Sequence, residues 1–398
     1  MKSKTIFLTR NGLMEPLGQS QVLRYVEGLS INFDVSIISF EKKQDFINVD
    51  LFHHINAHCL KSQINWIPNL FSKQHPRISL IRDLILMIWL SRKEVKKGAS
   101  LIHARSYIPA FAALIVSKLY KIGFIFDMRA LWPEELITAK RIKRGSLIHK
   151  LLIYLERKAI SSATSVIALT NASVEYLNEQ YPRELRNKNI HVIPTCADLD
   201  KFEPNKKSKN NFILGCSGTL LSGWFDLRKL AIFYAFVAKK NETINFEITT
   251  QENKSQIEAV LREHNFPMSR LNIFSAKASE MPKVNQVQTA SVMFYKGNEL
   301  SELGRSPTRM AEVLGCGNPV ISNSGVGDVA NVINKYQVGV LLDQIDNESL
   351  EQAYQSMMFL LKDPHLPLRC RNTAEKIFSL SYGIQCYQKI YQGILQTD

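Results

Sequence analysis

Short apolar runs alternate with longer amphipathic segments along most of the chain. Thr5–Thr9, Leu101–Arg105 and Phe124–Phe126 have the length and composition of buried strands, and segments with helical spacing of apolar positions lie between such runs. The same rhythm resumes in the second half, with strands expected at Phe212–Ser217 and Ile244–Thr250. Because strands that alternate with helices form parallel sheets, we predict an α/β protein.

The remaining predicted elements continue this alternation. Further strands are expected at 34–40, 165–170, 190–194, 271–275 and 291–295, and helices at 19–30, 107–120, 252–264, 281–288 and 382–395. A polar, basic stretch at Pro204–Asn211 interrupts the pattern and marks a boundary. A chain of 398 residues fits two domains of ordinary size. We place them at residues 1–198 and 199–380.

The segment 305–321, RSPTRMAEVLGCGNPVI, predicts a short helix followed by a buried strand. Ser306 suits the N-cap, and Pro307 suits the first helical position, where no N–H is needed. Gly315 and Gly317 are expected to end the helix.

The first turn of this helix is a candidate site for a nucleoside diphosphate. The free amides of Thr308 and Arg309 lie at the positive end of the helix dipole, which favours an anion. Arg305 and Arg309 add positive charge. Glu312 follows Thr308 by four residues on the same helix face, where its carboxylate can accept hydrogen bonds from a diol such as ribose. The alternative is an ordinary helix whose glutamate faces water.

Polar side chains also end two predicted strands of the first half. His103 and Arg105 end one strand, and Asp127 and Arg129 follow the next. Because ligands of open α/β sheets bind outside the carboxyl ends of strands, we expect these four side chains on one rim. An aspartate paired with an arginine stays ionised and can bind sugar hydroxyls.

Charge is unevenly distributed. The net charge is +14, of which residues 1–200 contribute +11 and the rest +3. A basic first half suits an anionic partner, either a lipid surface, a phosphorylated substrate or nucleic acid, although solubility alone explains it equally well. Two amphipathic basic segments, 66–97 and 140–158, are candidate membrane contacts; for the first, the loop at 66–71 is the better candidate.

The six cysteines show neither CxxC pairs nor metal-ligand spacing, so we expect reduced core residues in a cytoplasmic protein. The apolar run near the N-terminus is too short for a signal peptide, and Leu84–Leu90 is too short to span a bilayer. Asp198 and Asp200 form a D-x-D pair, but two carboxylates near a linker do not predict a metal site.

SPTRMAEVLGCGNPVI resembles the donor-site segment of the GT-B glycosyltransferases of the large retaining family four. HARSY and FDMRALWPEE resemble acceptor-side motifs of the same family, and IPTCADLDKF resembles the crossover that ends its N-terminal domain. The resemblance implies two Rossmann-like domains that face a cleft, the GT-B fold, and a final helix at 381–398 that crosses back onto the first domain. It also implies that no metal or other cofactor is required.

The resemblance assigns roles to residues of both domains. Glu312 would bind the ribose, while the earlier glutamate of many members is absent, because Gly304 stands eight residues before Glu312. The implied donor-binding residues are Gly18, Ser217, Gly218, Thr219, Ser306, Pro307, Thr308, Arg309 and Glu312. The implied acceptor-binding residues are Gln19, Arg105, Asp127 and Arg129, and the implied catalytic residues are His103, Asp127, Arg129 and Arg309.

These features together predict a retaining glycosyltransferase. It would move a sugar from a nucleotide-diphosphate sugar to a glycan or polyprenyl-linked acceptor in surface-polysaccharide assembly, with peripheral membrane contact through the basic N-terminal domain. One alternative is a nucleotide-sugar epimerase on the same fold. The other is a basic protein without enzymatic activity that binds membrane or nucleic acid.

Overall fold

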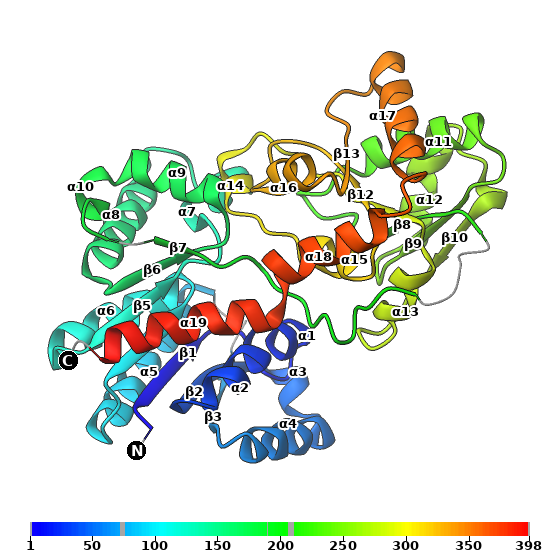
Figure 1. The fold of residues 1–398 in the computed structure, drawn as a ribbon. Coiled ribbons are helices and arrows are strands. Elements are labelled where there is room, and N and C mark those ends of the chain that lie inside the picture. Colours follow the sequence, from blue (N-terminus) through cyan, green and yellow to red (C-terminus); the bar gives the residue numbers. More distant parts are fainter. Residues whose placement is uncertain (1, 72–75, 189, 206–210, 397–398) are drawn as a thin grey trace. The chain divides into compact units, whose positions relative to one another are not determined.

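The computed structural model divides into two compact units, each with its own parallel sheet (Figure 1). Unit 1 comprises residues 1–194 and 380–398, and unit 2 comprises residues 195–379. The structure describes residues 2–71, 76–188, 190–205 and 211–396, so residues 206–210 of the predicted linker lie outside the described part. Each unit is a doubly wound α/β fold, which confirms the predicted pair of Rossmann-like folds.

Unit 1 is built on a seven-stranded parallel sheet of order β3-β2-β1-β4-β5-β6-β7. Its inner strands are largely buried on both faces, as in parallel sheets that carry helices on each side, whereas the two edge strands are half-buried or exposed. The strands are β1 (Lys4–Thr9), β2 (Asp34–Lys42), β3 (Asn65–Phe71), β4 (Leu101–Arg105), β5 (Gly123–Asp127), β6 (Ser165–Ala168) and β7 (Ile190–Val192).

The helices of unit 1 connect these strands, and one returns from the end of the chain. They are α1 (Pro16–Gly18), the π-helical η1 (Gln19–Leu23), α2 (Arg24–Ser30), α3 (Lys43–Phe46), α4 (Val49–Lys61), α5 (Pro76–Lys96), α6 (Tyr107–Tyr120), α7 (Trp132–Thr138), α8 (Leu147–Ser162), α9 (Asn171–Gln180), α10 (Pro182–Leu185) and α19 (Leu380–Leu395).

Two segments of unit 1 differ from their sequence interpretation. Trp66–Phe71, expected as a loop, belongs to edge strand β3, which pairs with β2 from Ser36 to Lys42. Pro68 is tolerated there because an edge strand has one unpaired side. The basic segment 140–158 is helical only from Leu147.

The last helix, α19, packs against α2 within unit 1 (Figure 1). A side chain at Gly28 would collide with Ile384, so glycine allows the two helices to approach closely. The Gln388 amide donates a hydrogen bond to the Gly28 carbonyl (2.9 Å). The chain terminus is therefore a structural part of unit 1.

Unit 2 has a six-stranded parallel sheet of order β10-β9-β8-β11-β12-β13. The strands are β8 (Ile213–Ser217), β9 (Asn245–Thr249), β10 (Leu271–Phe274), β11 (Ala290–Val292), β12 (Val320–Ser322) and β13 (Gly339–Leu341). The helices are α11 (Leu227–Lys240), α12 (Lys254–Glu263), η2 (Met268–Arg270), α13 (Met281–Val287), α14 (Leu300–Leu303), α15 (Thr308–Gly315), α16 (Val329–Tyr336), α17 (Asn347–Leu360) and α18 (Leu366–Phe378).

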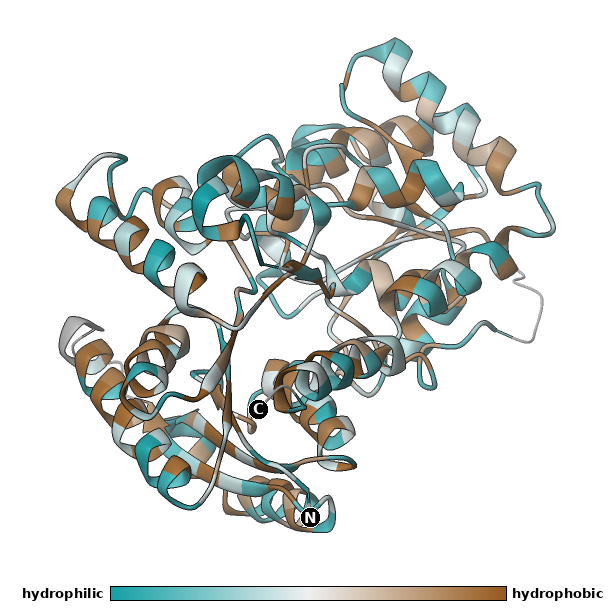
Figure 2. Cartoon of the chain, turned by 60° about the vertical axis from the view of Figure 1, so that its left-hand side comes forward, coloured by the Kyte–Doolittle hydropathy of each residue, from teal (hydrophilic) through white to brown (hydrophobic). Residues whose placement is uncertain are grey.

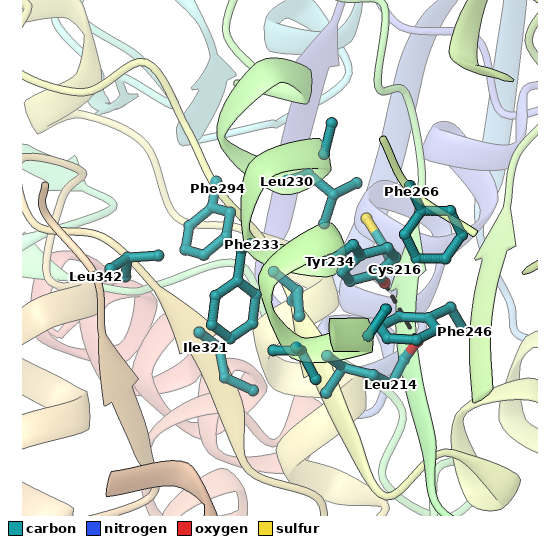
Figure 3. Packing of buried hydrophobic residues seen from close by; sticks show 14 of the residues in the cluster. Leu214, Cys216, Leu230, Phe233, Tyr234, Phe246, Phe266, Phe294, Ile321 and Leu342 are labelled. Atoms are coloured by element: carbon teal, nitrogen blue, oxygen red, sulfur yellow. Dashed lines mark hydrogen bonds between the residues drawn. The ribbon is translucent and has the colours of Figure 1, made fainter. Parts of the chain in front are cut away.

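The core of unit 2 forms where α11 packs on the sheet (Figure 3). Phe233 packs edge-to-face on Phe294, and Tyr234 packs on Phe246. The Tyr234 hydroxyl donates to the Leu214 carbonyl (3.2 Å), which satisfies its only polar group inside this apolar layer. All six cysteines are free thiols, and five of them are buried.

Strand order reverses at one point in each sheet. In unit 1 the reversal falls between β1 and β4, and in unit 2 it falls between β8 and β11. Doubly wound sheets bind ligands in the crevice outside the carboxyl ends of strands at this reversal. A ligand site is therefore expected at the turns after these four strands.

Candidate functional site

The helix expected to bind an anion is present in unit 2 as α15. Its N-cap is Pro307 rather than Ser306, so the predicted cap was wrong by one residue. The Ser306 hydroxyl is used elsewhere, because it accepts a hydrogen bond from the Thr195 amide (3.0 Å). In the described chain no group accepts a hydrogen bond from the amides of Thr308 or Arg309. The first turn thus keeps two free donors, as the sequence predicted.

The other end of α15 closes with a Schellman motif. Gly317 adopts φ +76°, its amide donates to the Leu314 carbonyl (2.9 Å), and the Asn318 amide donates to the Val313 carbonyl (3.2 Å). This closure fixes the helix end, and with it the direction in which the first turn points.

Arg309 turns from α15 toward the turn after β8. A Cβ atom at Gly218, where φ is +111°, would overlap the Arg309 guanidinium, so glycine is required there. The Arg309 Nη1 atom is buried and has no hydrogen-bond partner among the described residues. The guanidinium also lies 5.6 Å from the ring centre of Phe225 and 6.0 Å from that of Tyr295. Part of this cation remains available to a ligand at the strand-order reversal.

Glu312 lies one turn along the same helix from Thr308. Burial raises the pKa of its carboxyl to about 7, against a smaller opposing effect of Arg309. Throughout the described chain no group donates a hydrogen bond to this carboxylate. A carboxylate that is costly to ionise and lacks donors is suited to accepting hydrogen bonds from a ligand.

Arg305 does not supply the free positive charge that the sequence suggested. Its guanidinium makes a bidentate ion pair with Glu302 (2.6 and 2.9 Å), and Glu302 is 3% exposed. The charge of Arg305 is therefore offset within the protein. Because both Glu302 oxygens are engaged, Glu302 is also not free to replace the glutamate missing at Gly304.

The turn after β8 uses most of its own amides. The Gly218 amide donates to the Thr249 carbonyl (2.9 Å), and the amides of Leu220 and Leu221 both donate to the Glu252 carboxylate. Ser217 is buried and Thr219 is exposed. The anion-binding capacity of this region therefore rests on the α15 tip and Arg309 more than on the turn.

The turn after β1 in unit 1 is held in the same way. The amides of Leu13 and Met14 donate to the buried Glu41 carboxylate (2.9 and 3.0 Å). Gly18 packs directly against the Gly12 carbonyl, and the Gln19 amide group donates to the Met14 carbonyl (3.1 Å). The structure thus gives Gly18 a packing role and Gln19 an internal partner, and their contacts with ligands stay predictions.

His103, Arg105, Asp127 and Arg129 come together in unit 1 at the ends of β4 and β5. His103 Nε2 donates to Asp127 Oδ2 (3.3 Å), and Arg129 Nη1 lies 3.7 Å from Asp127 Oδ1. Arg105 donates to the side chain of Asn11 in the turn after β1 (3.0 Å). His103 and Asp127 are 0% and 1% exposed, so the cluster is a buried network.

Two tyrosines of α19 complete this network, and the sequence analysis missed both. The Tyr387 hydroxyl donates to Asp127 Oδ2 (3.1 Å), and the Tyr391 hydroxyl lies 3.0 Å from His103 Nδ1. Since Nε2 of the His103 ring faces a carboxylate, Nδ1 accepts from Tyr391. Their spacing of four residues marked one face of an amphipathic helix, but nothing in the sequence showed which residues that face meets.

The cluster favours a neutral histidine and an ionised aspartate. Burial lowers the pKa of His103, against the opposing effect of Asp127. Burial alone would raise the pKa of Asp127, but Arg129, His103 and Arg105 outweigh it and hold that pKa below its ordinary value. With Arg105 and Arg129 both charged, the network carries a net positive charge that suits an anionic ligand.

Two residues with unusual backbone angles also lie at this point. Ser106, directly after β4, has φ +77° and ψ 177°, and Arg129 has φ +59°. Residues other than glycine rarely adopt these angles, and such strain is retained mainly at functional sites.

The carboxylates do not assemble a metal site in the described chain. No three His, Cys, Asp or Glu side chains come together there in a way that could hold a metal ion, and Asp198 of the D-x-D pair forms an ion pair with Lys201 (3.3 Å).

Comparison with known proteins agrees with the fold. Residues 20–201 match the profile of a family described as Glycosyltransferase Family 4. No curated protein matches the chain in sequence. Similar solved structures include sucrose-phosphate synthase from Thermosynechococcus elongatus (15% identity, all of both chains covered, TM-score 0.70). HepE from Anabaena in complex with UDP-glucose is also similar (13% identity, 98% of this chain and 99% of that chain covered, TM-score 0.68). So is WaaG, a glycosyltransferase involved in lipopolysaccharide biosynthesis (13% identity, 98% of this chain and 99% of that chain covered, TM-score 0.65). The profile match and the shared GT-B fold support a glycosyltransferase.

Proposed function

We propose that this protein is a retaining glycosyltransferase that takes a sugar from a nucleotide-diphosphate sugar bound to unit 2. The observation that carries the proposal is the set of unsatisfied polar groups on α15. Two free amides and an unpartnered Arg309 nitrogen lie one helical turn from a carboxylate without donors. A diphosphate on the amides and Arg309, with its ribose on Glu312, would satisfy all of them.

The catalytic contribution of α15 is electrostatic. As the bond between the sugar and the diphosphate breaks, negative charge grows on the leaving oxygen. The amides of Thr308 and Arg309, the helix dipole and the Arg309 guanidinium stabilise that charge without a metal ion. Retention at the anomeric carbon then depends on a stabilised leaving group and on delivery of the acceptor to the same face of the sugar.

The acceptor belongs on unit 1 in this proposal. The positively charged network of Arg105, Asp127 and Arg129 would bind it, and His103 would orient Asp127 or contact the transferred sugar. Since His103 is fully buried with both ring nitrogens engaged, the orienting role fits its surroundings better. We further propose a glycan or polyprenyl-linked acceptor at the cytoplasmic face of the membrane, by analogy with WaaG.

A thermal-shift screen of nucleoside diphosphates and nucleotide sugars tests the donor site. A ligand at a hundred times its dissociation constant stabilises the protein by about 2.7 kcal/mol. We expect stabilisation by at least one nucleoside diphosphate and its loss in Glu312→Ala. If no nucleotide stabilises the protein, the proposal is wrong.

Product analysis then separates the transferase from an epimerase. Incubation with donor and acceptor should give a glycoside whose anomeric configuration, read by NMR, matches that of the donor. An isomerised sugar released without acceptor would favour the epimerase instead.

A further inference from the structure

Three neighbouring helices of unit 1 share an outward surface rich in exposed apolar side chains. The connections β3–α5–β4, β4–α6–β5 and β5–α8–β6 all run in one direction along the sheet, so right-handed crossovers place these helices on one face. Within that layer α6 packs against both α5 and α8. Apolar positions, brown in Figure 2, recur along the helices, and those exposed on these three are Ile81, Ile85, Trp89, Ile115, Leu119, Leu147, Ile148, Leu151 and Tyr154.

The spacing of these side chains matches the exposed faces of the helices. On α5 they follow one another at four-residue intervals, and on α8 Leu147, Leu151 and Tyr154 fall at intervals of four and three. The faces are fixed from behind, because Glu156 on the opposite side of α8 accepts hydrogen bonds from the buried hydroxyls of Tyr107 and Tyr181. The burial of Glu156 thus fixes the rotation of α8 about its axis, so that the apolar stripe on its other side faces solvent.

Among the described side chains of these three helices, all exposed charge is positive. Their acidic residues Asp83, Glu94 and Glu156 are 0%, 6% and 4% exposed. Arg82 and Arg157 are paired with Asp83 and Glu184. The remaining exposed cations are Arg92, Lys93, Lys96, Lys118, Lys150 and Lys158.

We infer that this outer surface of α5, α6 and α8, which we name the helix-layer surface, docks on an anionic lipid bilayer. Apolar side chains enter the interface while lysine and arginine ammonium and guanidinium groups reach the phosphates. Trp89, with the Lys93 ammonium 3.5 Å from its ring centre, and Tyr154 are side chains of the kind that concentrate at membrane interfaces. A second copy of the chain fits less well, because a two-fold interface would set this basic surface against itself. None of the described helices is long and apolar enough to cross a bilayer, so the contact is peripheral.

The position of this surface suits a lipid-linked acceptor. A helix that follows a parallel strand begins at the carboxyl edge of the sheet, where Arg105 and Asp127 lie. Six of the nine exposed apolar residues are in the first halves of α5 and α8, toward that edge. The loop before α8 adds the exposed cations Lys140, Arg141 and Lys143. In this respect the inference rests on the proposed function, since docking would hold the head group of a membrane acceptor near the network.

Vesicle flotation tests the inference directly. We expect the full chain to bind mixed phosphatidylcholine/phosphatidylglycerol vesicles at least about tenfold more tightly than phosphatidylcholine alone, because each basic residue contributes roughly fivefold. Raising the ionic strength should weaken this binding. The double variant Leu147→Glu with Leu151→Glu should lower it by about tenfold or more, since it removes apolar contact and adds negative charge. Both side chains are largely exposed (85% and 56%), so folding should be unaffected.

A matched control lies in unit 2. Phe359→Glu with Leu368→Glu replaces side chains of similar exposure (80% and 62%) outside the helix-layer surface and should leave flotation unchanged. The nucleotide-induced thermal shift of all variants should equal that of the parent, which separates failure of docking from failure of the proposed function. Equal binding to neutral and anionic vesicles, or equal loss in both double variants, would overturn the inference. The inference would also be overturned if the parent protein did not bind vesicles but self-associated in sedimentation experiments, and if Leu147→Glu with Leu151→Glu abolished that self-association.

Discussion

The two strand-order reversals of this protein differ in how completely their polar groups are satisfied. In unit 1 His103, Asp127 and Arg129 hydrogen-bond or pair with one another and with tyrosines of α19. Asp127 Oδ1 has the ion pair with Arg129 but no hydrogen bond among the described residues. In unit 2 Arg309 keeps an unpartnered buried nitrogen, and Glu312 has no donor in the described chain. A buried network whose polar groups are mostly satisfied is rigid and stabilising. Unsatisfied buried groups raise the free energy of the empty protein, and a ligand that pairs with them removes that cost.

The difference does not come from the turns. In each unit a glutamate near the end of the second strand, Glu41 or Glu252, accepts two consecutive amides from the turn after the first strand. The two units therefore share one device for shaping the turn. What distinguishes them is the set of side chains delivered beside it, which suggests a fixed platform in unit 1 and a ligand-completed site in unit 2.

Removing the central carboxylate of the unit 1 network should have the largest effect. Asp127→Ala leaves Arg105 and Arg129 buried without their counter-charge, and breaking a buried ion pair in this way costs about 3–5 kcal/mol. Urea unfolding followed by tryptophan fluorescence measures the loss, because Trp66, Trp89 and Trp132 lie in unit 1 and only Trp224 lies in unit 2. A change below 1 kcal/mol would show that the network does not stabilise the unit.

Arg309→Ala should instead remove activity with little loss of stability. The guanidinium is proposed to stabilise the leaving diphosphate, and loss of one such group costs about 10²–10³ in kcat. Stability should hold because a partly unpartnered buried cation contributes little to the empty fold.

Arg305→Ala is the matched control for that experiment. It removes the same charge four residues earlier, but it leaves Glu302 buried without its bidentate partner. We expect a clear loss of stability and a smaller change in kcat. If both arginine variants lose activity equally, the special role of Arg309 is refuted.

Glu312→Gln should stabilise the empty protein at alkaline pH. The carboxyl has a pKa of about 7 when folded and an ordinary value of 4.5, so the folded state holds its proton more tightly. The resulting stability is fully present below pH 4.5 and is lost as the pH rises through about 7. The total loss of folding free energy is about 3 kcal/mol. Glutamine never ionises, so the variant should gain this amount at pH 8 and nothing near pH 4, measured by urea unfolding.

The same variant should bind nucleoside diphosphates more weakly. A hydrogen bond to a charged acceptor contributes about 1.5–3 kcal/mol and one to a neutral acceptor about half as much, so affinity at pH 8 should fall about tenfold. Affinity of the parent should decline as the pH falls below 7, and that of Glu312→Gln should not. Parallel pH profiles measured by calorimetry would exclude contact between Glu312 and the ligand.

Local sequence rules were sufficient for the elements that bury an apolar face in a regular pattern. They gave the strands β1, β4 and β5 and the position of α15 to within one residue, because capping and periodicity act over a few residues. They failed for β3, whose residues are all half-buried or exposed and therefore show no run or alternation. Its pairing with β2 along seven residues, rather than its own pattern, makes it a strand.

The parts of the site that could not be predicted depend on contacts distant in sequence. Tyr387 meets Asp127 across 260 residues, and Tyr391 meets His103 across 288. The neutralisation of Arg305 was also missed. Glu302 lies in the four-residue helix α14 and Arg305 just after it, and so short a helix gives no spacing of apolar residues that defines a face. Motifs identified which residues carry chemistry but did not show which of them are already satisfied by the fold.

Tyr387→Phe should have only a small effect on stability, and its pH dependence tests the network most specifically. The variant removes a hydrogen bond to an ionised carboxylate, a loss of about 1.5 kcal/mol at neutral pH. Arg129, His103 and Arg105 hold the pKa of Asp127 below its ordinary 3.8, so this loss should be complete above pH 3.8 and shrink as the pH falls through the lowered pKa. Tyr391→Phe, one turn along α19, removes a hydrogen bond to the neutral His103 and should cost about 1 kcal/mol. Burial lowers the pKa of His103, so this loss should follow the protonation of His103 rather than that of Asp127. Identical acid profiles for the two variants in urea unfolding would mean that Asp127 is not ionised in the buried network. The positive charges of Arg105 and Arg129 would then have no counter-charge in that network.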